Sequence, residues 1–162
     1  MSVLTQRSTA IAELLKARGE TVAVAETSGG GLVSAALLAV PGASAYYLGG
    51  GVLYTMDARA ALLGISNDDL GGIRSSSEPY AELLARSIRD KLGATWGVAE
   101  TGAAGPQPNR YGDANGHSCV AVAGPRDAVF TLETGSDARE ENMWAFADAA
   151  LALFEKCLRA SS

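Results

Sequence analysis

The chain has 162 residues, a formal net charge of −5, 48% apolar residues and 19% charged residues. This length predicts a single domain over residues 1–162 that buries its own core, and the acidic balance argues against non-specific binding to nucleic acid. We find no apolar stretch of membrane-spanning length and no pattern of a secretion signal. The two cysteines, Cys119 and Cys157, have neither metal-ligand nor disulfide-framework spacing. We therefore expect a cytoplasmic protein with free thiols that binds no metal, cofactor or membrane.

Apolar periodicity predicts alternating helices and strands in the first half of the chain. In order, we expect a helix over residues 5–18, a strand over 21–25, a helix over 32–40, a strand over 45–54 and a helix over 58–63. The first strand is short, β-branched and apolar, which is typical of a strand buried on both faces. Gly49, Gly50 and Gly51 interrupt the next strand, so we expect a bulge or a close approach of backbone there.

The second half begins with a helix whose start is marked by Ser77, a capping residue, and by Pro79, which is tolerated in a first turn. We then expect a strand over residues 96–100, a loop over 105–116, a strand pair over 120–123 and 128–132, and a helix ending near residue 158. Asp137 and Glu140 have the spacing of a capping box for this last helix. The elements predict an α/β fold, a three-layer α/β/α sandwich around a mixed, mostly parallel sheet.

Two predicted strands end in the same chemistry, an acid followed by hydroxyl residues and glycines. The first end covers residues 26–30 and begins with Glu26 and Thr27, and the second covers residues 100–103 and begins with Glu100 and Thr101. In α/β proteins such strand ends converge on one crevice, where ligands bind. Their backbone N–H groups suit a phosphate or a developing oxyanion, so the pair predicts a small-molecule site. The alternative for each turn is a structural cap without a ligand.

Five further residues are candidates for chemistry, although each also has an ordinary structural explanation. Tyr54 closes a strand, Arg59 follows on the next helix, and Arg139 lies near the start of the last helix. The arginines suit a phosphate or surface ion pairs. His117 and Cys119 are close together at the start of an expected strand, where a Cys–His nucleophile pair would still need a group to orient it.

The order of these segments resembles the CinA C-terminal domain family over nearly the whole chain. The segments that carry the resemblance are residues 25–31, 40–44, 50–54, 61–65, 77–78 and 101–106. The family is known as nicotinamide mononucleotide deamidase, which hydrolyses the carboxamide to nicotinate mononucleotide and ammonia. The resemblance implies a three-layer α/β/α fold, a homodimer and a reaction without metal. It also implies the stand-alone form of the domain, without the molybdopterin-binding-like domain that precedes it in some members.

Several positions depart from the family's pattern. The family's serine nucleophile falls on Thr27, its loop threonine on Gly29, and its lysine after the tyrosine on Arg59. A second family lysine is missing from residues 113–117, and a late Gly-Asp-Arg segment is only approximated by residues 135–139. A threonine hydroxyl acts as a nucleophile if a base accepts its proton. Arginine stays protonated and cannot be that base.

The resemblance and the residue chemistry together assign roles at the expected site. Thr27 is the expected nucleophile, with Ser28 as the alternative, and the base is Tyr54, Glu26 or a bound water. Arg59 completes the catalytic set by stabilising an oxyanion or a phosphate. The expected substrate-binding residues are Glu26, Ser28, Gly29, Gly30, Gly50, Thr101, Gly102, Ala103 and Arg139.

Two other functions fit the same sequence. The missing lysines also fit a non-catalytic nucleotide-binding protein that kept the pocket and lost the chemistry. The same hydroxyl could instead hydrolyse another small amide or an ester.

Overall fold

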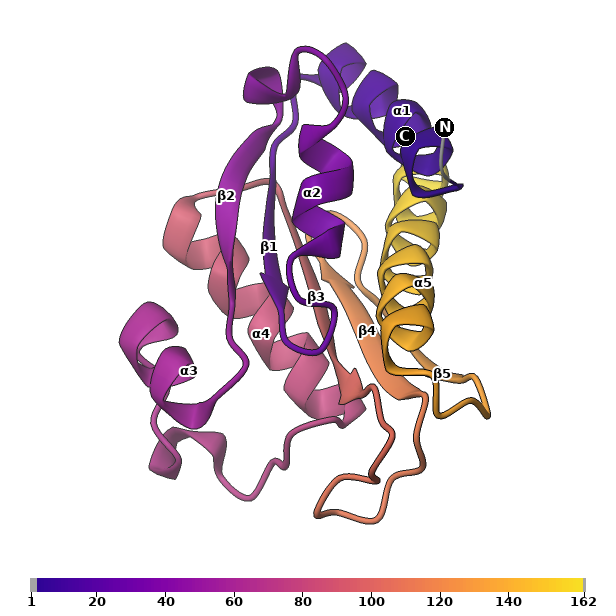
Figure 1. Ribbon diagram of the computed structural model, residues 1–162. Helices are drawn as coiled ribbons and strands as arrows, with labels where there is room; N and C mark the ends of the chain where they lie inside the picture. The colour runs from indigo at the N-terminus through magenta and orange to yellow at the C-terminus, as the bar shows by residue number, and fades with distance from the viewer. Residues whose placement is uncertain (1–2, 162) are drawn as a thin grey trace.

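The computed structural model describes residues 3–161, which form a five-stranded sheet between two layers of helices (Figure 1). The strands are β1 (Val22–Glu26), β2 (Tyr47–Val52), β3 (Trp96–Ala103), β4 (His117–Ala123) and β5 (Ala128–Glu133). The α-helices are α1 (Val3–Arg18), α2 (Leu32–Leu38), α3 (Met56–Leu63), α4 (Glu78–Leu92) and α5 (Arg139–Ala160). None of these helices is long and apolar enough to cross a membrane.

The sheet has the strand order β2-β1-β3-β4-β5. Strand β1 pairs in parallel with β2 and β3, whereas β4 pairs antiparallel with both β3 and β5. Four strands therefore run in one direction and only β4 runs against them. This is the mixed, mostly parallel sheet that the alternating elements predict, and it brings the ends of β1, β2 and β3 to one edge of the molecule.

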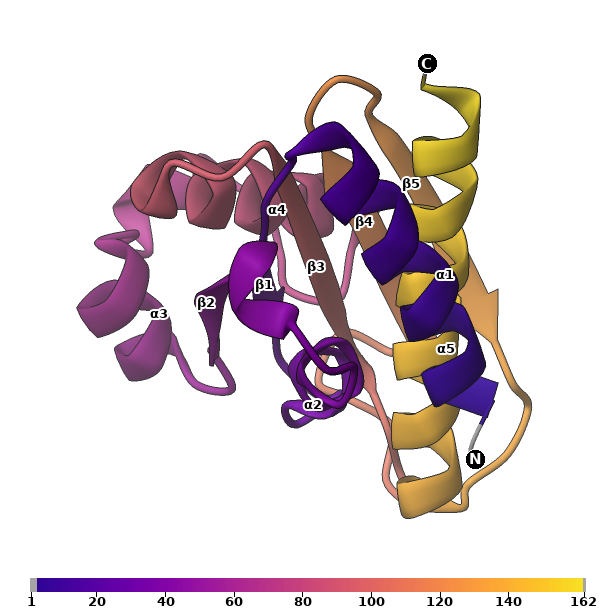
Figure 2. The same cartoon turned by 90° about the horizontal axis from the view of Figure 1, so that it is seen from above.

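The two faces of the sheet carry side chains of different size. Helices α1, α2 and α5 cover one face of the sheet and α4 covers the other (Figure 2). The fully buried valines of the strands and Trp96 pack in the first layer, whereas the buried alanines, Cys119 and Gly97 face α4. Residues alternate between the faces of a strand, so each strand supplies both layers. The small side chains allow α4 to lie very close to β3, since a Cβ atom on Gly97 would be 2.0 Å from the Ala85 carbonyl oxygen.

Several predicted boundaries are confirmed. Ser77 is the N-cap of α4 and its side chain accepts a hydrogen bond from the Tyr80 N–H, with a proline in the first turn. Strand β2 contains the expected irregularity, because Val22 pairs with Tyr47 while the next residue of β1 pairs with Gly49. The register shift leaves one extra residue in β2.

Other predicted boundaries are wrong. Helix α2 stops at Leu38, two residues before the expected end, and β3 continues to Ala103 because it pairs with β4 from its second residue to its last. The capping box of Asp137 and Glu140 does not form. Helix α5 begins at Arg139 after Ala138, which has no side chain that can cap it.

The close packing between α4 and β3 can be tested by replacing single glycines with alanine. We expect Gly97→Ala to lower the free energy of unfolding by about 3 kcal/mol, because its methyl group overlaps backbone rather than a movable side chain. Chemical denaturation measures the change. Gly51→Ala is the matched control, since its Cβ atom would meet only Leu62 and Leu53 at 3.4 Å and 3.5 Å. A stability change of less than about 1 kcal/mol is expected there, and an equal loss in both variants would contradict the packing argument.

Candidate functional site

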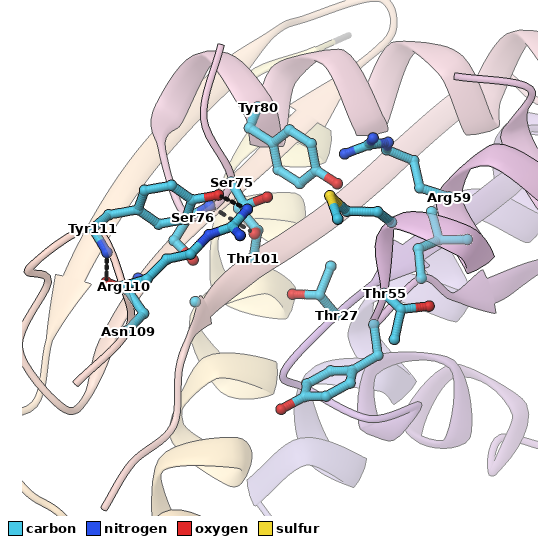
Figure 3. A pocket seen from close by; sticks show the side chains of 14 residues that line it. Thr27, Thr55, Arg59, Ser75, Ser76, Tyr80, Thr101, Asn109, Arg110 and Tyr111 are labelled. Atoms are coloured by element: carbon cyan, nitrogen blue, oxygen red, sulfur yellow. Dashed lines mark hydrogen bonds between the residues drawn. The ribbon is translucent and has the colours of Figure 1, made fainter. Parts of the chain in front are cut away.

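A cavity of about 410 Å³ opens where the chain leaves β1, β2 and β3 (Figure 3). Four groups of residues line it: the strand ends, the first turns of α3, the segment that leads into α4 together with its first turn, and the loop between β3 and β4. The lining residues are Thr27, Leu53, Tyr54, Thr55, Met56, Arg59, Ser75, Ser76, Tyr80, Thr101, Gly102, Asn109, Arg110 and Tyr111. The structure thus brings five predicted site residues together in one cavity: Thr27, Tyr54, Arg59, Thr101 and Gly102.

Thr27 presents its hydroxyl to the cavity from the turn after β1. Its side chain is almost buried, and no other residue in the range 3–161 forms a hydrogen bond with its hydroxyl (Figure 3). Ser28 differs, because its Oγ donates a 2.5 Å hydrogen bond to the Glu100 carboxylate and the residue does not line the cavity. Of the two predicted nucleophiles, only Thr27 is available for chemistry in this arrangement.

The Glu100 carboxylate holds this turn in place. Its Oε1 accepts hydrogen bonds from the N–H groups of Thr27 at 3.2 Å and Gly29 at 2.6 Å. Its Oε2 accepts from the hydroxyls of Ser28 and Ser118. Burial raises the pKa of Glu100 above its usual 4.5, although the hydrogen bonds from Ser28, Gly29 and Thr27 oppose that shift.

Glu26 is a cap for α2 and does not line the cavity. Its Oε1 accepts from the N–H groups of Gly31 and Val33, and its Oε2 accepts from the Ser34 N–H. A carboxylate at a helix N-terminus satisfies N–H groups that have no partner inside the helix. The predicted roles of Glu26 in catalysis and substrate binding therefore do not fit its position.

The N–H groups of Gly29 and Gly30 were expected to bind an oxyanion, and the structure places them elsewhere. The Gly29 N–H donates to Glu100, and the Gly30 N–H donates to the Thr27 carbonyl. Gly29 lies between the two buried acids, since a Cβ atom there would be 3.0 Å from both Glu100 and Glu26. A side chain at this position would crowd the two carboxylates.

Two other expected substrate contacts also lie outside the cavity. Gly50 lies within β2, and a Cβ atom there would be 2.1 Å from the Val24 carbonyl oxygen, so close strand packing accounts for the glycine. Ala103 pairs with His117 of β4 and does not line the cavity. Their roles in the sheet replace the predicted contacts with substrate.

Arg59 is a buried cation at one end of the cavity. Its side chain is 2% exposed, with Nε donating to the Ile65 carbonyl at 3.0 Å and Nη2 to Asn67 Oδ1 at 2.5 Å. Its guanidinium carbon lies 6.0 Å from the centre of the Tyr80 ring. Among the described residues, no carboxylate pairs with Arg59. Because a buried charge without a counter-ion is unfavourable, this end of the cavity suits an anion.

Arg139 and Tyr54 contact each other at the rim. Arg139 Nη2 donates to the Tyr54 hydroxyl at 3.1 Å, and Nη1 donates to the Gly105 carbonyl. Tyr54 is 61% exposed and Arg139 does not line the cavity. Arg139 can therefore reach a ligand only at the mouth of the cavity.

The loop between β3 and β4 supplies lining residues that the sequence motifs did not reveal. Asn109, Arg110 and Tyr111 form the end of the cavity opposite Arg59 (Figure 3). The Tyr111 ring lies near two guanidinium groups, with Arg110 at 5.0 Å and Arg74 at 5.2 Å from its centre. A hydrogen bond from Arg110 lowers the pKa of Tyr111. The only sequence signal was the length of this loop, since long ordered loops are often functional.

The lining residues include two arginines and no Asp, Glu, Lys or His. The cavity is therefore locally cationic in a chain whose net charge is −5. Arg110, like Arg59, forms no ion pair within residues 3–161. This arrangement can bind an anionic molecule beside the Thr27 hydroxyl, but it offers no side chain of ordinary basicity to accept a proton.

His117 and Cys119, which the sequence places close together, are not arranged as a nucleophile pair. Cys119 Sγ and His117 Nε2 are 3.7 Å apart, but neither residue lines the cavity and Cys119 is 1% exposed. Burial raises the pKa of the Cys119 thiol, which disfavours the reactive thiolate. No cluster of His, Cys, Asp and Glu that could hold a metal ion lies among the described residues.

Comparison with known sequences identifies relatives. A model of the CinA C-terminal domain matches residues 4–158. A CinA-like protein of Prochlorococcus marinus (strain MIT 9313) is 45% identical over 115 residues, which are 71% of this chain and 27% of that protein. A CinA-like protein of Chlorobium limicola (strain DSM 245 / NBRC 103803 / 6330) is 34% identical over 146 residues, which are 87% of this chain and 34% of that protein. The chain thus spans about a third or less of the length of these relatives.

Solved structures have the same fold. A competence-damaged protein (CinA) superfamily protein from Enterobacter cloacae has a TM-score of 0.88 and 26% identity, covering 98% of this chain and 94% of that chain. The competence/damage inducible protein CihA from Agrobacterium tumefaciens has a TM-score of 0.86 and 27% identity, covering 98% and 99%. The predicted fold class and the family resemblance are both confirmed.

Substitution by glutamine should affect stability differently at the two buried glutamates, Glu100 and Glu26. In Glu100→Gln, the new NH₂ group can donate to Ser28 and Ser118, whose hydroxyls can reverse and accept. In Glu26→Gln, the NH₂ group must face a backbone N–H of α2, which can only donate. We expect Glu100→Gln to change the free energy of unfolding by less than about 1 kcal/mol and Glu26→Gln to lower it by about 2 kcal/mol.

Denaturation at several pH values checks this difference. Because the pKa of Glu100 is raised above 4.5 in the folded protein, its proton stabilises the fold at acidic pH, and this contribution is lost as the pH rises through the folded pKa. Glu100→Gln has no proton to lose at this position, so its free energy of unfolding should not show this decrease with rising pH. Equal destabilisation by both substitutions would contradict the assigned hydrogen bonds.

Proposed function

The chain belongs to the CinA C-terminal domain family, and we propose that its cavity binds a pyridine mononucleotide and hydrolyses the carboxamide to release ammonia. The observation that carries the proposal is an unbonded Thr27 hydroxyl in a cavity with unpaired arginines and no acidic residue. A phosphate is the anion that such a nucleotide brings. The pyridine ring of the nucleotide carries the carboxamide, and the Thr27 hydroxyl is the nucleophile that attacks it.

The proposed roles follow from the hydrogen bonds already formed. Arg59 binds the phosphate, because its Nε and Nη2 are held by protein acceptors and the guanidinium edge beside the cavity is left for an anion. Thr101 Oγ1 accepts a 3.1 Å hydrogen bond from the Ser76 N–H, so its own proton is available to an oxyanion in the cavity. Arg139 and Tyr54 lie at the entrance of the cavity.

The proposed reaction has two steps. Thr27 Oγ forms a bond to the carboxamide carbon, the C–N bond breaks, and ammonia leaves with the hydroxyl proton. A water molecule then hydrolyses the threonine ester, which gives the carboxylate and restores the hydroxyl. Of the expected bases, Glu26 is engaged by three N–H groups and the Tyr54 oxygen accepts from Arg139, so water is the proton carrier that remains.

A second candidate function is nucleotide binding without hydrolysis. The observation that favours it is the lack of Lys, His, Asp and Glu among the lining residues, since threonine needs help to lose its proton. Hydrolysis of another small amide or ester would use the same hydroxyl with different recognition at the arginines.

Ammonia release from nicotinamide mononucleotide tests the reaction. We expect the wild-type protein to release ammonia and Thr27→Ala to lose at least about 100-fold of that rate, because the nucleophile is removed. Thr27→Ser is the matched control, since it keeps a hydroxyl at the same place and should retain turnover. Unchanged turnover in Thr27→Ala would show that Thr27 is not the nucleophile. Binding without release in the wild type would favour the second candidate.

The phosphate contact is tested by calorimetric binding. Arg59→Met keeps an unbranched apolar chain but removes the charge, so affinity for nicotinamide mononucleotide should fall by about 10- to 100-fold. Nicotinamide riboside lacks the phosphate and should bind the variant and the wild type equally. An equal loss for both ligands would mean that Arg59 acts on the shape of the cavity and not on the phosphate.

A further inference from the structure

The imidazole of His117 lies behind the cavity wall that Ser75 and Ser76 form. Its Nε2 is 2.8 Å from the Ser76 carbonyl oxygen, and its Nδ1 is 2.5 Å from Glu133 Oε1. A carbonyl oxygen and an ionised carboxylate can each accept a hydrogen bond but cannot donate one. Both ring nitrogens must therefore donate, and the hydrogen bonds are complete only when His117 is an imidazolium.

The charged groups around His117 favour this form. Glu133 faces it from β5, Asp113 faces it from the loop with Oδ1 3.7 Å from Nε2, and Cys119 lies beside it on β4. Asp113 is itself paired with Arg74, and Glu78 of α4 reaches the neighbouring Thr131 rather than His117. Burial lowers the pKa of His117, but Glu133, the Ser76 carbonyl and Asp113 outweigh burial and raise it above 6.5.

Ser76 needs external support to keep its conformation. Its φ is +58°, the only positive φ of a non-glycine residue within 3–161, and this left-handed conformation is unfavourable for a residue that carries a side chain. Its N–H donates to Thr101 Oγ1, and His117 Nε2 makes the shortest hydrogen bond to its carbonyl, at 2.8 Å. Arg74 Nη1 and Cys119 Sγ donate to the same carbonyl from longer distances, 3.5 Å and 3.7 Å. The same peptide segment thus connects His117 to a hydroxyl that lines the cavity.

We propose that His117 is a positioning residue whose proton holds Ser76, and through it the Thr101 hydroxyl, in the geometry that binds ligand. When the ring loses its proton, the strong bond to Glu133 keeps Nδ1–H, and the Nε2 lone pair then faces the Ser76 carbonyl oxygen. Because both of these atoms are then acceptors, the hydrogen bond between His117 and Ser76 is lost and Ser76 relaxes from its left-handed conformation. Ligand binding weakens as the pH rises through the pKa of His117. This inference rests on the proposed function only for the identity of the ligand.

Nuclear magnetic resonance of the unliganded protein tests the connection without any ligand. We expect the ring ¹⁵N shifts of His117 and the amide proton shift of Ser76 to change with one common midpoint above pH 6.5. Glu133→Gln removes the exposed carboxylate and should lower that midpoint by about 1 pH unit. Cys119→Ser is the control for the nearby thiol and should leave the midpoint unchanged. A Ser76 amide that does not follow His117, or that follows Cys119 instead, would overturn the proposal.

Binding of nicotinamide mononucleotide provides the second arm. The wild-type affinity should fall by about 3- to 10-fold from pH 7 to pH 9, where the phosphate stays a dianion, and His117→Gln should bind with no such dependence. Glu133→Gln should move the fall to lower pH, which keeps the test valid if His117→Gln does not fold. A wild-type affinity that is constant over this range would overturn the proposal. Failure of the nucleotide to bind at any pH would contradict the proposed function instead, and the ligand-free measurement would still decide the role of His117.

Discussion

The hydrogen bonds of the buried Glu100 carboxylate are the constraint on which the site depends. They join the end of β3 to the turn after β1, and they take up the N–H groups of Thr27 and Gly29 together with the Ser28 hydroxyl. With the neighbouring serine turned inward, Thr27 is the residue of this turn that presents a free hydroxyl. Glu26 performs the equivalent task on the other side of Gly29 by capping α2. The two acids therefore have structural roles: they hold the turn and cap α2 without lining the cavity.

The charge of the cavity wall has the opposite sign to the net charge of the chain. Its wall contains Arg59 and Arg110 and no carboxylate, although the chain as a whole is acidic. An unpaired buried guanidinium remains favourable only if something compensates it, and a bound anion does so. The proposed binding of an anion therefore rests on these local contacts, which net charge cannot reveal. In the proposed function, Arg59, which stands where the family has lysine, therefore serves binding rather than proton transfer.

Local patterns predict much of the fold, because each depends on neighbours in sequence. The apolar run of β1, the serine cap of α4 and the glycine irregularity of β2 all follow from such patterns. Side-chain roles at the site are harder, because they depend on partners far along the chain: Ser28 and Glu100 are 72 residues apart. The same reason hides Arg110 and Tyr111, whose loop folds back to the cavity by tertiary contacts. The capping box failed because α5 starts later than the motif implies.

A crystal structure with nicotinate mononucleotide, the product of the proposed reaction, tests the central claim most directly. The account predicts that the phosphate contacts the Arg59 guanidinium and that the pyridine carboxylate lies beside the Thr27 hydroxyl, with the Thr101 hydroxyl donating to it. In that structure the Glu100 and Glu26 hydrogen bonds should be unchanged, because the turn is already formed. A nucleotide bound outside this cavity, or with its phosphate away from Arg59 and its carboxylate away from Thr27, would contradict the account.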